Sequence, residues 1–212
     1  MDLQLNRAKL RLIYFNIRGR GELIRLILHA ADKDFIDQRV TSAEWPTLKP
    51  TLPFKKLPVL EVTTPNGDKV LLNESIAITR LLARTFNLYG NDAREIYLIE
   101  RLNSLISSLM EEIFSFKLKD ADNFSKIVSV DHLNELFDSI EMALKERSGT
   151  FIVGNRVTQA DLLILTLIDT IEKFLPKFKH GCLAELDEIK ENVLKQKPNV
   201  ARYLRSRPVT DF

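Results

Sequence analysis

A tyrosine beside a loop rich in arginine and glycine is the first place in the chain where chemistry could occur. Tyr14 lies near the end of an apolar run that begins at Leu10, and Arg18-Gly-Arg-Gly21 follows shortly after. Both glycines are free to take positive φ angles there. A phenol next to cationic side chains and a helix N-terminus could hold an anion. A half-buried strand tyrosine beside solvated arginines fits the same pattern, so this stretch alone leaves both interpretations open.

Hydrophobic spacing predicts the elements that position Tyr14. The apolar run from Leu10 to Phe15 has strand length, and residues 23–28 repeat their apolar side chains at helical spacing. A second strand is predicted over 35–40, and a connection of this length makes the two strands parallel. Residues 57–62 read as a third strand, and Asn66-Gly67 supplies the hairpin turn to a fourth strand over 69–72. A further helix is predicted to begin at Asn73-Glu-Ser75.

This order predicts an α/β plus all-α protein with two domains. Residues 1–86 give a thioredoxin-like domain, βαβ followed by ββα, with a four-stranded mixed sheet. Residues 93–212 give an all-helical bundle, in which Thr158-Gln-Ala-Asp161 forms a capping box ahead of a helix apolar nearly all round. The single cysteine, Cys182, rules out an internal disulfide and also the cysteine pair of a thioredoxin.

Composition excludes several classes of function. The chain has 212 residues and a net charge of +2 from 31 basic and 29 acidic residues, without a basic stripe for nucleic acid. No apolar stretch approaches the length of a membrane span, and the N-terminus lacks a signal-peptide core. Together with the lone cysteine, this predicts a cytoplasmic protein. The three histidines do not show the spacing of a metal site, so no metal is expected.

Five motifs in order resemble the cytosolic glutathione S-transferases, and among them the sigma class, which includes prostaglandin D synthases and the 28 kDa transferases of flukes. The resemblance extends over about residues 9–212. The motifs are Tyr14-Phe-Asn-Ile-Arg-Gly-Arg-Gly-Glu22, Glu44-Trp-Pro46, Leu57-Pro-Val-Leu60, Asn73-Glu-Ser-Ile-Ala-Ile78 and Gly154-Asn-Arg-Val-Thr-Gln-Ala-Asp161.

The resemblance implies glutathione as co-substrate and a role for Tyr14 in catalysis. A free cysteine thiol has a pKa of about 8.5, so little of it is ionised at neutral pH. By resemblance, the Tyr14 hydroxyl donates a hydrogen bond to the glutathione sulfur and stabilises the thiolate. The matching arginine of the family, Arg20 here, supports both groups electrostatically.

The remaining glutathione contacts are also carried over from the family. Leu57 matches the residue whose backbone pairs with the cysteinyl part of the peptide, and the following Pro58 is cis in the family. Ser75 matches the ligand of the γ-glutamyl carboxylate, and Glu74 replaces a common glutamine. The residues matched to the glycyl end and the side of the peptide are Trp45, Lys49 and Lys56. Segment 100–108 carries serines where the family has acids that reach the partner subunit, so no metal site is carried over.

The resemblance further implies a homodimer and an apolar pocket for the electrophile. That pocket would include Phe15, Ile17, Ile106, Leu109, Leu163 and Phe212, each of which also fits ordinary core packing. The resulting expectation is a detoxifying transferase that adds glutathione to apolar electrophiles. Two alternatives remain open: a glutathione-dependent isomerase that converts prostaglandin H to D, and a non-catalytic ligand-binding or crystallin-like protein.

Overall fold

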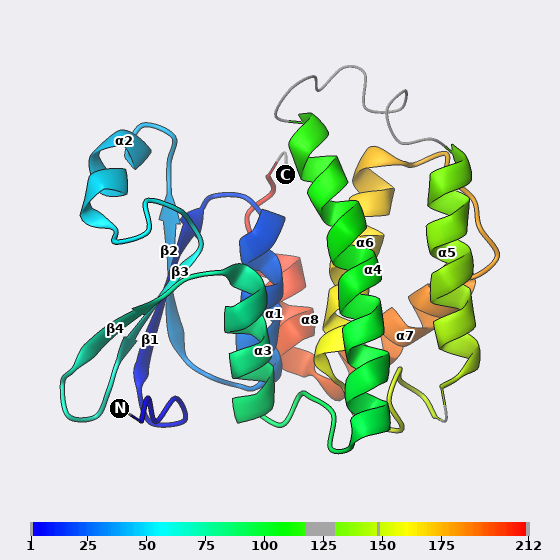
Figure 1. Cartoon of the computed structure of the whole chain (residues 1–212), viewed down its shortest axis with the longest axis horizontal. Helices are drawn as coiled ribbons and strands as arrows, with labels where there is room; N and C mark the ends of the chain where they lie inside the picture. The colour runs from blue at the N-terminus through cyan, green and yellow to red at the C-terminus, as the bar shows by residue number, and fades with distance from the viewer. Residues whose placement is uncertain (1, 118–129, 148, 211–212) are drawn as a thin grey trace. The chain divides into compact units, whose positions relative to one another are not determined.

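The computed structural model describes residues 2–117, 130–147 and 149–210, and they divide into two compact units (Figure 1). The first unit runs to Leu88 and also includes the residues from Lys197 onward, and the second spans Tyr89–Gln196. The sequence led us to expect domains over residues 1–86 and 93–212, and these bounds stay a prediction. The last helix, α8 (Pro198–Ser206), groups with the first unit, although the sequence assigned it to the helical domain.

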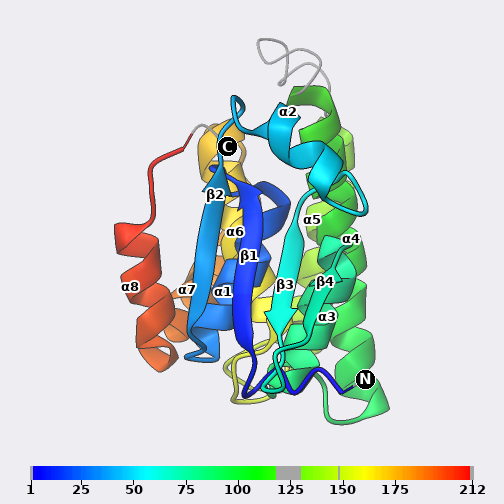
Figure 2. The same cartoon turned by 90° about the vertical axis from the view of Figure 1, so that its left-hand side faces the viewer.

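The first unit contains the predicted four-stranded mixed sheet. Its strands are β1 (Lys9–Phe15), β2 (Phe35–Val40), β3 (Val59–Thr63) and β4 (Lys69–Leu72), in the order β2-β1-β3-β4 (Figure 2). Strands β1 and β2 are parallel, whereas β3 is antiparallel to both β1 and β4. The parallel pair and the hairpin are therefore confirmed.

Short helices connect these strands and cover the sheet. They are α1 (Glu22–Ala30), α2 (Trp45–Leu48) and α3 (Ser75–Thr85), with 3₁₀ turns at Gly19–Gly21 and Lys49–Thr51. Helices α1 and α3 lie side by side on one face of the sheet (Figure 1). Helix α1 buries its apolar residues almost completely, because its spacing presents one continuous apolar face to the sheet. Gly67, at φ +91°, provides the left-handed position of the β3–β4 turn.

Strand direction brings distant segments to one edge of the sheet. Strands β1, β2 and β4 point the same way, so their carboxyl ends share an edge with the beginning of the antiparallel strand β3. This edge gathers Tyr14, the segment after Val40, the Leu57–Pro58 peptide and the start of α3 at Ser75. Ligands of open α/β sheets bind at such carboxyl ends.

The second unit is helical, as expected. It contains α4 (Ala93–Lys117), α5 (Val130–Lys145), α6 (Gln159–Phe174) and α7 (Leu183–Gln196). Helix α6 is buried along nearly its whole length. The predicted capping box opens it: the Thr158 amide and hydroxyl each donate to Asp161 Oδ2 over 2.7 Å. Among the residues that the structure describes, no helix is long and apolar enough to cross a membrane.

Candidate functional site

Tyr14 is a buried side chain near the carboxyl end of β1, with 6% of its surface exposed. The last registered pair between β1 and β3 joins Ile13 to Val59. The next residue of β1 and the preceding residue of β3 are therefore neighbours, which brings Tyr14 opposite Pro58. The Leu57–Pro58 peptide bond is cis, as the family resemblance implied.

The arginine-glycine loop folds over the Tyr14 ring. The backbone N–H of Arg20 donates a hydrogen bond to Tyr14 Oη over 3.0 Å. Gly19 has the expected positive φ, +37°. Gly21 does not use that freedom, because its φ is −84°. Gly21 is needed for a different reason: a Cβ there would lie 2.4 Å from Cδ1 of Tyr14, so only a glycine lets the loop approach the ring.

Burial and nearby positive charge act in opposite directions on the Tyr14 hydroxyl. Burial raises the pKa of Tyr14, while the Arg20 amide and the charges of Arg20 and Arg25 lower it, and the net result is a pKa above the usual value of 10.0. Tyr14 is therefore a protonated phenol at neutral pH. Its oxygen accepts the Arg20 N–H and its own proton remains for donation to an anion.

An aromatic row leads from Tyr14 to a lysine. The Phe15 ring makes edge contacts with Tyr14, at 5.8 Å between centroids, and with Trp45, at 5.3 Å. The Lys49 ammonium lies 5.9 Å from the Trp45 ring centroid. Phe15, Trp45 and Leu57 pack against one apolar cluster at this end of the sheet. Lys56 is exposed, and it directly precedes Leu57.

The start of helix α3 has an unusual backbone. Glu74 occupies the N-cap position with φ +67° and ψ +100°, and its side chain makes no capping hydrogen bond. The sequence led us to expect Asn73 as the capping residue of this helix, but the N-cap position is one residue later. A non-glycine residue with this φ is strained, and such strain concentrates at functional sites. With Ser75 as the first helical residue, the N–H groups of the first turn are available to a carboxylate.

The residues predicted for the electrophile pocket fall in both units. Phe15 and Ile17 are half-buried in the first unit. Ile106, Leu109 and Leu163 are buried in the second unit, with exposed fractions of 0%, 2% and 6%. Phe212 lies outside the described residues. The three residues of the second unit have the burial of core residues, and the role of all six residues in one pocket stays a prediction.

Sequence reasoning missed a buried ion network behind the tyrosine. Arg25 and Glu22 lie three residues apart on α1, and both are almost fully buried. Asp37 on β2 pairs with Arg25 over 3.0 Å and with Arg39 over 2.8 Å. The sequence does contain one indication of this network. Arg25 interrupts the apolar run of residues 23–28, and a charged residue at a buried position needs charged or polar partners.

One cluster of metal-type donors occurs in the second unit. Ligand atoms of Asp138, Glu141 and His180 lie within 4.8 Å of one another. His180 Nε2 lies 3.1 Å from Asp138 Oδ1, and Lys145 pairs with Glu141 over 2.6 Å. The Cys182 amide donates to His180 Nδ1 over 3.3 Å. These contacts join the three side chains and Lys145 in one polar cluster.

Cys182 itself is buried beside that cluster, with 3% of its surface exposed. Burial and the charge of Glu141 raise the pKa of its thiol to about 11. A buried thiol with such a pKa is a small apolar side chain rather than a nucleophile.

The four-stranded mixed sheet and the additional helical unit assign the chain to the thioredoxin-like proteins that carry an all-α domain. Two family models match in tandem: the glutathione S-transferase N-terminal domain over residues 10–84 and the C-terminal domain over residues 105–207. The chain belongs to the glutathione S-transferase family, whose enzymes use glutathione as co-substrate.

Individual relatives agree over nearly the full length. A glutathione S-transferase class-mu 28 kDa isozyme of Schistosoma japonicum is 36% identical over 206 residues, which covers 95% of this chain and 100% of the relative. The Fasciola hepatica sigma class GST structure is 32% identical with a TM-score of 0.89, covering 97% of this chain and 100% of that one. Rat hPGDS complexed with a quinoline is 26% identical with a TM-score of 0.82, covering 96% and 100%.

Proposed function

We propose that the protein conjugates glutathione to apolar electrophiles and that Tyr14 stabilises the reacting thiolate. The observation that carries this proposal is the hydroxyl of Tyr14, which accepts the Arg20 N–H over 3.0 Å and keeps a proton to donate. A hydrogen bond to a charged acceptor is worth about 1.5–3 kcal/mol, which lowers a thiol pKa by about one to two units. Arg20 adds positive charge beside the same oxygen.

The peptide part of glutathione would bind along the shared sheet edge. In this proposal, backbone groups of Leu57 pair with the cysteinyl residue as an added strand would, next to Pro58. Ser75 and the first turn of α3 hold the γ-glutamyl carboxylate, and the exposed Glu74 carboxylate pairs with the neighbouring ammonium. This assignment is supported by the position of all four residues, which lie at the sheet edge where β1 ends: Leu57, Pro58, Glu74 and Ser75.

The glycyl end of glutathione would lie against the aromatic row. Trp45 packs against Phe15, which in turn contacts Tyr14, so these rings connect the proposed position of the thiol with that of the glycyl end. Lys49, beside the Trp45 ring, supplies a countercharge for the glycyl carboxylate, and Lys56 flanks the peptide.

A conjugation assay with an aryl halide tests this function directly. Replacing Tyr14→Phe should lower turnover about tenfold or more, while affinity for glutathione changes little. Full turnover in the variant would remove Tyr14 from the mechanism. Retention of the wild-type protein on immobilised glutathione without any turnover would instead favour the non-catalytic, ligand-binding alternative.

A second candidate reaction is the glutathione-dependent isomerisation of prostaglandin H to D. The similarity to rat hPGDS and to the Fasciola sigma class enzyme supports this candidate and a sigma class assignment. The same thiolate would bond to one endoperoxide oxygen as the O–O bond breaks and the other oxygen becomes a hydroxyl. Loss of the proton from the carbon that bears the attacked oxygen would then form the ketone and release the thiolate, so the proposed role of Tyr14 is unchanged. Incubation with glutathione and prostaglandin H, followed by product analysis, separates isomerase from conjugating activity.

The proposed setting is a cytoplasmic homodimer. Exposed apolar side chains support a protein interface, among them Ile76 on α3, at 45% exposure, and Tyr97 on α4, at 60%. Sedimentation analysis should give twice the mass of the chain. The variant Ile76→Glu should reduce that mass to that of a monomer if α3 contributes to the interface.

A further inference from the structure

Arg25 is a fully buried arginine whose donors reach the backbone directly after the tyrosine. Its exposed fraction is 0%. Nη1 donates to the carbonyl of Ile17 over 2.8 Å and Nη2 to the carbonyl of Phe15 over 3.4 Å. On the other side, Nε donates to both oxygens of Asp37, and Nη1 also reaches Glu22 over 3.2 Å. One guanidinium therefore joins the loop after β1 to helix α1 and strand β2.

The same guanidinium faces the ring of Tyr14. Arg25 Cζ lies 5.7 Å from the ring centroid. The loop that Arg25 holds at Phe15 and Ile17 continues into the 3₁₀ turn that donates the Arg20 N–H to Tyr14 Oη. The hydrogen bond from the Arg20 N–H to Tyr14 Oη therefore requires that the backbone of residues 15–21 keeps this conformation.

We propose that Arg25 is a positioning residue for the thiolate-stabilising tyrosine: its fork holds the loop so that the Arg20 amide meets Tyr14 Oη. This inference rests on the proposed role of Tyr14. Arg25 does not touch substrate in this proposal. A lysine at the same place would keep the positive charge but lacks the planar fork that binds two carbonyls and a carboxylate together.

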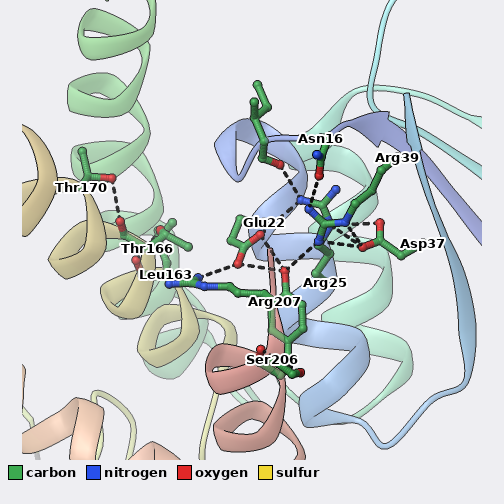
Figure 3. A network of polar contacts seen from close by, with 12 residues as sticks. Asn16, Glu22, Arg25, Asp37, Arg39, Leu163, Thr166, Thr170, Ser206 and Arg207 are labelled. Atoms are coloured by element: carbon green, nitrogen blue, oxygen red, sulfur yellow. Dashed lines mark hydrogen bonds and ion pairs between the residues drawn. The ribbon is translucent and has the colours of Figure 1, made fainter. Parts of the chain in front are cut away.

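The carboxylates around Arg25 are themselves held in place, in part by the last helix (Figure 3). Tyr203 Oη donates to Glu22 over 2.9 Å, and Arg207 Nη1 donates to Glu22 over 2.7 Å. Burial and the charge of Glu22 raise the pKa of Tyr203, so its hydroxyl stays a donor. Burial disfavours the charge on Arg25, but Asp37 and Glu22 together raise its pKa. Arg25 thus remains a cation with fixed partners.

The test compares Arg25→Lys with wild-type protein and reads out the thiol pKa of bound glutathione from the ultraviolet absorbance of the thiolate. We expect this pKa to rise by about one unit, because the Tyr14 hydroxyl loses its alignment. Well below the thiol pKa, kcat should fall about tenfold, since one unit removes nine tenths of the thiolate. KM for glutathione should stay within about twofold, because Arg25 does not contact the peptide.

Arg11→Lys is the matched control. Arg11 lies on the same strand as Tyr14 and pairs with Glu61 over 2.5 Å, with 37% of its side chain exposed. Arg11 pairs with a carboxylate as Arg25 does, but this carboxylate, Glu61, lies on β3 and not in the loop after β1. This variant should keep both the thiol pKa and kcat of the wild type.

Two outcomes would overturn the inference. An unchanged thiol pKa in a folded Arg25→Lys protein, with only a lower melting temperature, would reduce Arg25 to a structural role. If that variant does not fold, Asp37→Asn replaces it, because it weakens the anchor of Arg25 from β2, and an unchanged thiol pKa there has the same meaning. Tyr14→Phe distinguishes the proposals: if this variant leaves the thiol pKa unchanged, the role of Tyr14 itself fails.

Discussion

Gly21 and Tyr14 are in such close contact that no side chain fits between them. A Cβ placed on Gly21 would lie 2.4 Å from Cδ1 and 2.7 Å from Cγ of the Tyr14 ring. Helix α1 begins one residue later, so its N-terminus is fixed against the flat face of the tyrosine. The position of the hydroxyl therefore depends on the absence of a single methyl group.

Gly21→Ala should impair both stability and turnover. The new methyl must displace either the tyrosine ring or the start of α1, and such overpacking costs about 1–3 kcal/mol. We expect a lower melting temperature and a loss of turnover of about tenfold or more, because the Tyr14 hydroxyl moves. Gly181→Ala is the control, since nothing lies within 4 Å of a Cβ at that position. Wild-type turnover in Gly21→Ala would contradict the tight contact.

At saturating glutathione, the pH dependence of kcat/KM for the electrophile should report the bound thiol of glutathione and not the phenol. Burial raises the pKa of Tyr14 above 10.0, so Tyr14 stays protonated throughout the neutral range. Activity should rise with pH as the bound thiol ionises, about one to two units below the free value of about 8.5. In Tyr14→Phe this pKa should move up toward that free value. A profile that is identical in both proteins would show that the phenol does not stabilise the thiolate.

Ser75→Ala should weaken glutathione binding more than it slows chemistry. The serine hydroxyl is proposed to bind the γ-glutamyl carboxylate, and losing a bond to a charged group costs about 1.5–3 kcal/mol, which corresponds to about tenfold or more in Kd. Calorimetry with glutathione measures this directly. Ser139 is a half-buried serine on α5 whose hydroxyl donates to the Glu135 carbonyl of the same helix, so Ser139→Ala should bind glutathione normally. Equal affinities in the two variants would contradict the assignment of Ser75.

Cys182 should resist alkylation in the folded protein. Its thiol is buried and has a pKa of about 11, so almost none of it is thiolate at neutral pH. Incubation with iodoacetamide should leave the native mass unchanged, whereas the same reagent in denaturant should add one carbamidomethyl group. Rapid modification of the native protein would show that the thiol becomes accessible.

The sequence predicted the sheet for identifiable physical reasons, and the proposed site residues remain a prediction. The Asn66-Gly67 turn and the apolar runs are local signals, so strand pairing followed from them. Tyr14 and Ser75 were recognised because their motifs occur in family order, and topology then brings them to one edge. The buried Arg25 network was missed because it depends on tertiary packing between α1, β2 and the loop after β1, which no local pattern indicates.

A substitution at Asp161 tests how much the capping box of α6 contributes to the stability of the helical unit. Its buried carboxylate accepts the Ile152 N–H over 2.9 Å, in addition to the amide and hydroxyl of Thr158. An asparagine can replace only part of this pattern, because its NH₂ group faces donors. We expect Asp161→Asn to lower the free energy of unfolding by about 2–4 kcal/mol, measured by urea denaturation.

The control for this prediction lies on the same helix. Glu172 pairs with Lys190 over 3.3 Å and is 60% exposed, and an exposed ion pair contributes only about 0–1 kcal/mol. Glu172→Gln should therefore unfold close to wild type. If Asp161→Asn were as stable as Glu172→Gln, the capping box would hold the helix start without stabilising the fold. A large difference between them would mean that the buried acceptor, rather than the charge as such, stabilises the start of α6.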